Sequence, residues 1–501
     1  MPTPTSRASS AGLLAGVYAA SVAGADWLHA HRLAAAAVGA PLVLAALAAV
    51  HHGVLLGFPN SGDEYVYLYQ ARMFAGGEVS HAAAGAAELF HFNYIAREAG
   101  RVFGTFPPGW PLALGLAIAA GVPAGLVNPA LGVLTLALVW ALGARLYTPR
   151  IGVIAAAIVG VSPFFVFTAA SYFSHTFCGA LLLAAAWVAA RDDRNPAWVP
   201  LAIGALVGWA VLARYLTGVV VAVPIVWWLL RPGVPRARTL LLVALGGLPW
   251  VGVLMAYNLT LSGSPWHLTT TPLTVSRWFA DGSLLRGADI LASHLVRHLL
   301  WTPPVLLVAY GLYLRVATRD ERRGLFAWLP VLMAAALYFY MERGGNQYGA
   351  RFHYEVFPFA VLFVTAQIFA GGTLAAASRR DRRVFAALAV SVALMPVAFL
   401  AHAAIERRVV RERMDPFTMA AAAGLHDALV LISGRVGSAR SMAAFDLTRN
   451  DLDLRADVIY GLDPGQGARC GPAARVGGRA TYVYVWSLAQ ARGVLEPVVC
   501  P

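Results

Sequence analysis

Two adjacent carboxylates, Asp63 and Glu64, open the longest polar interruption in the N-terminal half of the sequence. They follow an apolar run from about 33 to 56, so they stand where a membrane helix would leave the bilayer. Charges are costly there unless they have a function. A carboxylate that faces a hydroxyl group can act as a general base. Simple solvation of acidic side chains at a helix exit is the competing interpretation.

Three arginines, Arg214, Arg343 and Arg351, provide the opposite charge at the ends of later apolar runs. Arg214 and Arg351 each stand beside such a run. An arginine at a bilayer surface can bind a phosphate through two parallel hydrogen bonds and stabilise it as it leaves. Snorkelling of Arg214 and interfacial anchoring of Arg351 are the plainer alternatives. A base and a phosphate clamp on one face would suit group transfer from a lipid phosphate.

The elements that must position these residues are membrane helices. The chain has 501 residues, of which 59% are hydrophobic and 13% charged, whereas a soluble protein carries about 25% charged residues. Its mean hydropathy is +0.64, and apolar runs long enough to cross a bilayer recur along it. The net charge of +13 comes from arginine without lysine, clustered between apolar runs. This positive-inside pattern argues against nucleic-acid binding and for a polytopic membrane protein.

The arginine clusters also decide the topology. If the segment from Pro108 to about Val122 spanned the bilayer, every later cluster would lie on the outside. If it is instead a juxtamembrane or re-entrant helix, all five clusters fall in the cytoplasm. We therefore expect an all-α protein with about eleven spanning helices, within a range of 11–13: 33–56, 128–145, 150–170, 174–191, 197–213, 215–230, 239–259, 299–316, 325–341, 354–376 and 384–403.

The same topology divides the chain into three parts. Residues 1–32 form a cytoplasmic segment, 33–403 the transmembrane module, and 404–501 a small extracytoplasmic α/β domain. Within the module, 58–127 form the first external loop, with an amphipathic helix around Tyr65 to Met73 at the interface. In the last domain, residues 457–460 and 481–486 are predicted strands and 417–433 a helix.

The three cysteines differ in their surroundings. Cys178 lies inside an apolar run and is predicted to be inert packing. Cys470 and Cys500 lie in the polar tail, and an extracytoplasmic tail would permit a disulfide between them.

Several short motifs in the expected membrane module resemble those of a known superfamily. Gly62-Asp63-Glu64-Tyr65 with Tyr69-Gln70-Ala71, followed by Phe106-Pro107-Pro108-Gly109-Trp110-Pro111, resembles the GT-C glycosyltransferases of the protein O-mannosyltransferase and lipid A aminoarabinose transferase type (glycosyltransferase family 39-like). The resemblance covers roughly residues 40 to 375. It continues in Ser162-Pro163-Phe164-Phe165 with Ser174-His175-Thr176, in Arg214-Tyr215-Leu216-Thr217-Gly218, and in Gly345-Asn346-Gln347-Tyr348-Gly349-Ala350-Arg351-Phe352 with Pro358.

The resemblance implies inverting transfer of a sugar from a polyprenyl phosphate to a lipid, glycan or protein acceptor. It places the enzyme in the plasma (inner) membrane, with the active site and C-terminal domain on the extracytoplasmic side. Asp63 would be the general base, with Glu64 the neighbouring candidate, and Arg214 and Arg351 would bind phosphate. The substrate pocket would include Tyr65, Tyr69, Pro107, Pro108, His175 and Tyr348. Many members have an acidic residue where this chain has His175, and some have a lysine where it has Phe106.

A metal and two other functions stay open at this point. Oligosaccharyltransferase-like members use an Asp-x-Asp pair with a divalent ion, but Asp63 and Glu64 are adjacent and their side chains diverge. We therefore expect no cofactor and no metal, although an oxygen-only Mg or Mn site completed elsewhere is an alternative. A diphosphate-donor polysaccharide ligase and a multi-helix transporter are the other candidate functions. The absence of an internal repeat speaks against the transporter.

Overall fold

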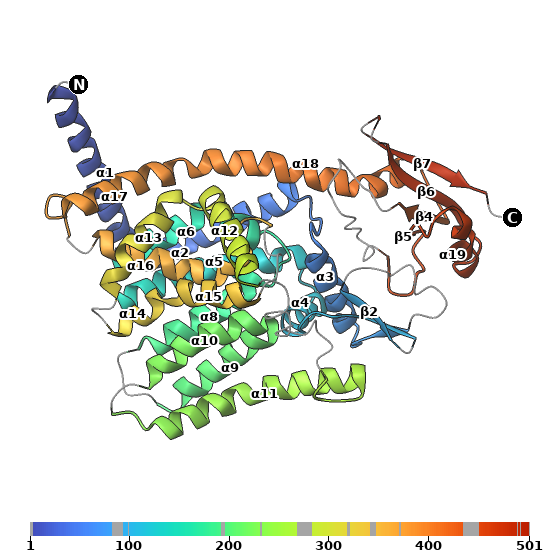
Figure 1. The fold of residues 1–501 in the computed structure, drawn as a ribbon, viewed down its shortest axis with the longest axis horizontal. Coiled ribbons are helices and arrows are strands. Elements are labelled where there is room, and N and C mark those ends of the chain that lie inside the picture. The colour runs from blue at the N-terminus through green and yellow to red at the C-terminus, as the bar shows by residue number, and fades with distance from the viewer. Residues whose placement is uncertain are drawn as a thin grey trace.

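The structure is a computed structural model. It describes residues 4–82, 94–98, 100–191, 196–230, 233–267, 283–317, 321–340, 347–369, 372–433, 450–487, 489–490 and 492–499. Most of these residues form a packed group of helices, and a small sheet lies at one end of the molecule (Figure 1). This confirms the predicted fold class.

Long apolar helices make the chain a multi-pass membrane protein. Within the described residues, five helices are long and apolar enough to cross a membrane, and one bent pair would make a sixth. Shorter apolar helices of 10–17 residues accompany them. The predicted count of eleven spans therefore stays a prediction. The five are Arg32–Val54, Ala124–Leu146, Arg236–Ser262, Arg351–Phe369 and Arg379–Ala422.

The N-terminal part begins with two helices, α1 (Pro4–Ala30) and α2 (Arg32–Ala49). A π-helical turn, η1 (Val50–Val54), continues α2 to the start of the first loop. The predicted span at 33–56 corresponds to α2 and η1. The segment 1–32, which we expected to be cytoplasmic, is largely the helix α1.

The first loop is a compact layer. It contains α3 (Gly62–Ala75) and α4 (Gly109–Ala119), with a sheet of order β1-β3-β2 between them. Helix α4 has 11 residues, about 16 Å of helix, which is too short for a hydrocarbon core of about 30 Å. The three strands were not predicted: β1 (His81–Ala82), β2 (Ile95–Glu98) and β3 (Arg101–Gly104).

Helix α3 differs from the prediction in its surroundings. It forms where we expected a helix, but its residues from Glu64 to Ala71 are all buried. It therefore does not lie with one face in the bilayer interface. Its two sides pack instead against α4 and strand β3. We predicted an amphipathic helix from its mixture of apolar and polar residues. In the structure, these residues belong to a helix that is enclosed on several sides.

The next helices form the centre of the molecule. One predicted span, 150–170, is broken in the structure: α6 and α7 meet at Ser162 and Pro163 with a bend of 72°. Proline at the first position of α7 has no N–H for a helix to use, so it permits this new start. The central helices are α5 (Ala124–Leu146), α6 (Pro149–Val161), α7 (Pro163–Ala169), α8 (His175–Ala189), α9 (Trp198–Ala213) and α10 (Tyr215–Leu229).

Helix α11 (Arg236–Ser262) lies along the outside of this group (Figure 1). It contacts α9 closely, because a Cβ at Gly204 would lie 2.0 Å from the carbonyl oxygen of Val243. Only 6% of its most apolar stretch of 18 residues is buried inside the protein. Near its C-terminal end, the Arg101 guanidinium of strand β3 donates hydrogen bonds of 2.9 and 3.1 Å to the carbonyls of Thr260 and Leu261.

The later helices correct one predicted boundary. We predicted a span at 299–316 after an external loop, but α12 (Ser283–Trp301) fills the second half of that loop, and α13 (Pro304–Ala317) begins after Pro303. The proline pair at 303–304 ends one helix and starts the next. They are followed by α14 (Glu321–Ala327), α15 (Leu329–Tyr340), the 3₁₀ helix η4 (Arg351–Val356), α16 (Phe357–Phe369) and α17 (Arg379–Ala393).

Helix α18 (Met395–Ala422) runs without a break from the membrane helices to the C-terminal sheet (Figure 1). The predicted domain boundary at 403–404 therefore falls inside a helix. The sheet has the order β5-β4-β6-β7, and its first three strands are parallel. Strands β5 and β6 confirm the two predicted strands. The strands are β4 (Ala428–Ile432), β5 (Val458–Leu462), β6 (Ala480–Ser487) and β7 (Arg492–Val498).

The predicted helix at 417–433 is wrong in its second half. Helix α18 ends at Ala422, and Ala428–Ile432 is the fully buried strand β4. A short apolar run in the middle of a sheet has no alternation that distinguishes it from a buried helix. The cysteine predictions lie nearby: Cys178 is free and buried, Cys470 is disulfide-bonded, and Cys500 lies outside the described residues.

Candidate active site

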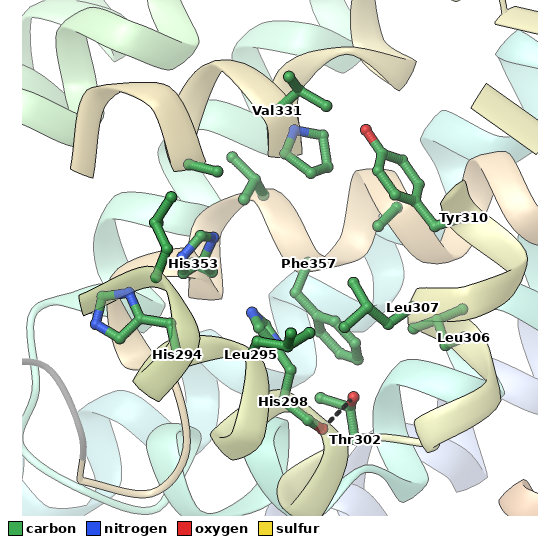
Figure 2. Close-up of a pocket in the computed structure, with 15 residues that line it drawn as sticks. His294, Leu295, His298, Thr302, Leu306, Leu307, Tyr310, Val331, His353 and Phe357 are labelled. Carbon is green, nitrogen blue, oxygen red and sulfur yellow. Dashed lines mark hydrogen bonds between the residues drawn. The ribbon is translucent and has the colours of Figure 1, made fainter. Parts of the chain in front are cut away.

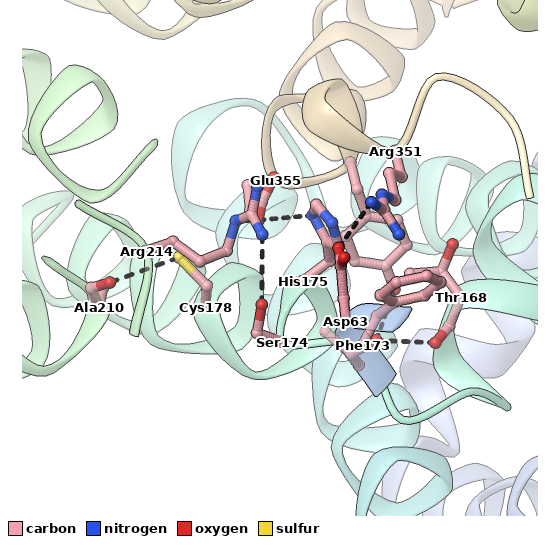
Figure 3. Close-up of polar contacts among 12 residues, drawn as sticks. Asp63, Thr168, Phe173, Ser174, His175, Cys178, Ala210, Arg214, Arg351 and Glu355 are labelled. Atoms are coloured by element: carbon pink, nitrogen blue, oxygen red, sulfur yellow. Dashed lines mark hydrogen bonds and ion pairs between the residues drawn. The ribbon is translucent and has the colours of Figure 1, made fainter. Parts of the chain in front are cut away.

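The start of α3 brings Asp63 against Arg351. The Ser61 hydroxyl caps α3 by accepting a hydrogen bond from the Glu64 N–H, and Asp63 lies in the first turn, where a helix favours negative charge. Arg351 is the first residue of η4. Its Nη2 lies 2.6 Å from Asp63 Oδ2 (Figure 3). The two side chains are 9% and 20% exposed, so the pair is reachable and yet largely removed from water.

A second cluster forms around Arg214. This residue joins α9 to α10 in an extended conformation. Its Nε lies 3.0 Å from Glu355 Oε1, and its Nη1 donates to Ser174 Oγ at 3.2 Å. His175 Nδ1 lies 3.0 Å from the same oxygen of Glu355 (Figure 3). Glu355, which belongs to η4, therefore contacts both Arg214 and His175 through one carboxylate oxygen.

Two phenylalanine rings connect the two clusters. The guanidinium carbon of Arg351 lies 4.2 Å from the centre of the Phe173 ring. The Phe352 ring is 5.6 Å from the guanidinium carbons of both Arg351 and Arg214. Cation–π contacts at this range favour the charged arginines. The two predicted phosphate-binding arginines thus both contact one aromatic side chain, whereas Arg343 lies outside the described residues.

Unused donors remain in the site. Among the described residues, Arg351 Nε and Nη1 are buried and have no hydrogen-bond partner. A buried donor without a partner is costly, and a charged guanidinium N–H forms a strong hydrogen bond to a phosphate oxygen. The arrangement can therefore accept an anion beside the Asp63 carboxylate.

Glu64 has a different environment from its neighbour. It is 1% exposed, and its Oε2 accepts a hydrogen bond of 2.9 Å from the Tyr172 N–H. Burial raises the pKa of Glu64 to about 8, against the opposing effects of that hydrogen bond and of Arg351. The two adjacent carboxyl groups are thus divided between a partly exposed ion pair and a buried, mostly protonated acid.

The loop 171–174 is held by three hydrogen bonds from two residues. Trp110 Nε1 donates to the Tyr172 carbonyl at 2.9 Å. Asn128 Nδ2 donates to the carbonyls of Ser171 and Phe173 at 2.6 and 2.8 Å. These contacts hold Phe173 beneath Arg351. They also give Trp110, the aromatic residue of the predicted Pro-Pro-Gly-Trp-Pro motif, a supporting role.

The other predicted pocket residues divide into two groups. Pro107 and Pro108 precede α4, with Pro108 at its N-cap. Tyr65 is buried beside Phe58. Tyr348 lies close before Arg351, and its hydroxyl accepts a hydrogen bond from Asn60. These four and His175 lie in the main core or beside it.

Tyr69 lies elsewhere. It packs in a separate core cluster with Met73, Val102 and residues of the C-terminal sheet. The structure therefore does not bring it to the Asp63–Arg351 pair. Its position joins the first loop to the C-terminal domain.

Sequence reasoning missed Glu355. It stands in the run Phe352-His353-Tyr354-Glu355-Val356, at the start of an apolar helix. The signal that could have identified it is the presence of an ionisable residue at the edge of a membrane segment. Its partners, His175 and Arg214, are distant in sequence, so spacing could not pair them.

A separate apolar pocket lies on the other side of η4. Its volume is about 270 Å³, and α12, α13, α15 and α16 supply most of its lining (Figure 2). His294, His298 and His353 stand at one end, and Leu306, Leu307 and Phe357 contribute apolar surface. Burial lowers the pKa of His298 to about 4, so this side chain is neutral at physiological pH. The pocket suits an apolar chain more than an ion.

No metal-binding cluster is present in the part of the chain that the structure describes: no group of three or more His, Cys, Asp or Glu side chains could hold an ion there. Metal independence stays a prediction.

Comparison with known proteins gives a partial family match and a shared fold. Residues 106–258 match the family model of dolichyl-phosphate-mannose-protein mannosyltransferases. The structure of ArnT from Cupriavidus metallidurans bound to undecaprenyl phosphate has a similar fold, with a TM-score of 0.51 and 15% identity, over 93% of this chain and 99% of that one. The comparisons thus show a partial match to this mannosyltransferase family and, over nearly the whole chain, a fold similar to that of ArnT.

Two further comparisons complete these findings. The apo form of the same ArnT gives a TM-score of 0.48 at 16% identity, over 93% of this chain and 98% of that one. The Archaeoglobus fulgidus oligosaccharyltransferase with Zn and sulfate gives 0.43 at 12%, over 88% and 68%. No curated protein sequence matches the chain.

Proposed function

We propose that the protein transfers a sugar from a polyprenyl-phosphate donor to an acceptor hydroxyl, with inversion at the anomeric carbon. The observation that carries the proposal is that two buried nitrogens of Arg351, Nε and Nη1, lack hydrogen-bond partners directly beside Asp63. An anion site and a carboxylate base are the two groups that this reaction needs at one place.

In the proposed reaction, Arg351 donates to the donor phosphate from one of its two unpartnered nitrogens, Nε or Nη1, which point to different sides of the guanidinium, while Nη2 keeps Asp63 oriented. Arg214 supplies the second positive charge across Phe352. Asp63 takes the proton of the acceptor hydroxyl as its oxygen attacks the anomeric carbon from the face opposite the phosphate. The bond between that carbon and the phosphate oxygen breaks, and the leaving phosphate keeps the electron pair.

The lipid part of the donor has support from the fold and the comparisons. The similar ArnT structure is described as bound to undecaprenyl phosphate, and the matched family acts with dolichyl-phosphate-mannose. The apolar pocket on the other side of η4 offers a place for an isoprenoid chain within reach of the same element that carries Arg351. We place the site on the extracytoplasmic face, since the arginine clusters then lie in the cytoplasm.

The test is transfer of labelled sugar from a panel of polyprenyl-phosphate sugars by the purified protein in lipid nanodiscs. Asp63→Asn should lower kcat by about 10²- to 10⁴-fold, as loss of a general base does. Asp26→Asn is the matched control: it also breaks an ion pair of 2.6 Å, with Arg150, but in α1. It should keep the wild-type rate.

The outcomes separate the candidate functions. Transfer that survives Asp63→Asn would assign the base to another group. Transfer only from diphosphate-linked donors would indicate a polysaccharide ligase. Absence of transfer from every donor, combined with substrate uptake by proteoliposomes, would indicate a transporter.

A further inference from the structure

Asn60 joins three separate segments of the chain next to the Asp63–Arg351 pair. Its side chain is 0% exposed. Its Nδ2 donates to Tyr348 Oη at 3.3 Å and to Glu406 Oε2 at 3.1 Å. Its Oδ1 accepts a hydrogen bond of 2.7 Å from Arg413 Nη1.

The Asn60 main chain is held as well. Its carbonyl oxygen accepts a hydrogen bond of 2.8 Å from Gln347 Nε2, and it also contacts Arg413 Nη1. Both the side chain and the backbone of this one residue are therefore fixed by the segment 347–348 and by α18. A residue with only a packing role needs no such set of directional contacts.

The connected segments are those that carry the ion pair. Asn60 lies three residues before Asp63, just ahead of the Ser61 cap of α3. Gln347 and Tyr348 lie just before Arg351 at the start of η4. The separation of the two charged groups is thus set through Asn60 rather than through a continuous helix or strand.

Tyr348 needs support in this arrangement. Its backbone is left-handed, with φ of 57°, which is costly for a bulky aromatic residue and persists only where the surroundings fix it. The hydrogen bond from Asn60 is one of the contacts that hold the ring end of this side chain. Loss of Asn60 would release the turn that presents Arg351.

We propose that Asn60 is a positioning residue for the Asp63–Arg351 pair, and that α18 sets its position through Glu406 and Arg413. The expected effect of Asn60 on sugar transfer rests on the proposed function. Its expected effect on the Asp63–Arg351 ion pair does not. Through Glu406 and Arg413, α18 would take part in positioning the reacting groups. The same helix leads into the C-terminal sheet.

The first test measures transfer. Asn60→Ala and Arg413→Ala should each lower kcat by at least about tenfold, since small misplacements of reacting groups are costly, and should also raise the donor KM, because Arg351 is the proposed phosphate ligand. Arg408→Ala is the matched control, because it removes the same charge from an exposed position of the same helix, 76% exposed. It should leave kcat and KM unchanged. An unchanged kcat in Arg413→Ala would overturn the role of α18.

The second test needs no activity. Tm values of Asp63→Asn, Arg351→Gln and the double variant measure the coupling between the two charged groups. In the wild-type background the Tm changes should be non-additive, and in the Asn60→Ala background the non-additivity should fall by at least half. Unchanged coupling would overturn the proposal even if no donor supports transfer, so the two failures are distinguishable.

A reversal of one hydrogen bond separates positioning from general loss of folding. Asn60→Asp places a carboxylate beside Glu406 and should lower kcat. Adding Glu406→Gln lets the new amide donate to the new carboxylate, while Arg413 keeps its acceptor. The double variant should recover at least half of the lost kcat. No recovery, with both proteins folded to the same Tm, would contradict the proposal.

Discussion

The contrast between Glu64 and Asp63 gives a prediction that can be worked from the structure. Burial raises the pKa of Glu64 to about 8, so at pH 7 the protonated form exceeds the ionised form about tenfold. Glu64→Gln then replaces one neutral group by another that can still accept the Tyr172 N–H. We expect transfer at pH 7 to stay within about threefold of wild type, whereas Asp63→Asn abolishes most of it.

The same substitution has a defined effect on stability. The folded state keeps a proton on Glu64 that the unfolded state releases above its ordinary pKa of 4.5. The resulting stability, relative to Glu64→Gln, is fully present below pH 4.5 and is lost as pH rises to about 8, by about 1.4 kcal/mol per pH unit. From pH 5 to pH 7 this is roughly 2.7 kcal/mol, or about 2 to 3 °C in Tm for a chain of this size.

The measurement is Tm of both proteins in nanodiscs across pH 5 to pH 8. The Tm difference, Glu64→Gln minus wild type, should rise steadily with pH. Asp463→Asn is the control, since the hydrogen bonds from Arg469 lower the pKa of Asp463; this carboxyl is ionised in both states across this range and should give a flat difference. A flat difference for Glu64→Gln, or loss of transfer equal to that of Asp63→Asn, would refute the assignment of Glu64 as a buried neutral acid.

Three further predictions follow from the packing. Glu355→Gln removes the counter-charge of Arg214, and an unpaired buried charge is costly. We therefore expect donor KM in steady-state kinetics to rise about tenfold and Tm to fall; an unchanged KM and an unchanged Tm would contradict this. Gly204→Ala should separate α9 from α11, since its Cβ would meet the Val243 carbonyl at 2.0 Å, and a wild-type Tm would show that the contact relaxes freely. Cys470→Ser should destabilise the C-terminal domain by about 2 to 4 kcal/mol without changing donor KM, as limited proteolysis and kinetics would show.

The helical framework could be predicted because a membrane helix is recognisable from its own stretch of sequence. Runs of apolar residues and the arginines between them place most elements to within a few residues, and the α/β tail was visible from its composition. The break between α6 and α7 was missed, although Ser162-Pro163 marks it, because continuous hydropathy outweighed a proline in the prediction. The strand β4 was missed because burial on both faces removes the alternation of a strand.

The site was only partly predictable, for a physical reason. Asp63, Arg214 and Arg351 stand out because each is charged at the edge of an apolar run. Glu355 and Asn60 gain their significance from partners far away: His175 is 180 residues from Glu355, and Arg413 is 353 residues from Asn60. Contacts of that separation are set by the fold and leave no local pattern.

Helix α11 makes the thickness of the bilayer relevant to the site. Its 27 residues extend about 40 Å, about 10 Å more than a typical hydrocarbon core, so it must tilt or project. Its C-terminal end is bound by Arg101, and the Tyr257 hydroxyl receives a hydrogen bond of 3.1 Å from Gln70 of α3. A change of hydrophobic mismatch along this outer helix would therefore reach α3, whose first turn carries Asp63. The lipid composition of the membrane, which sets the bilayer thickness, would thus influence the position of the first loop.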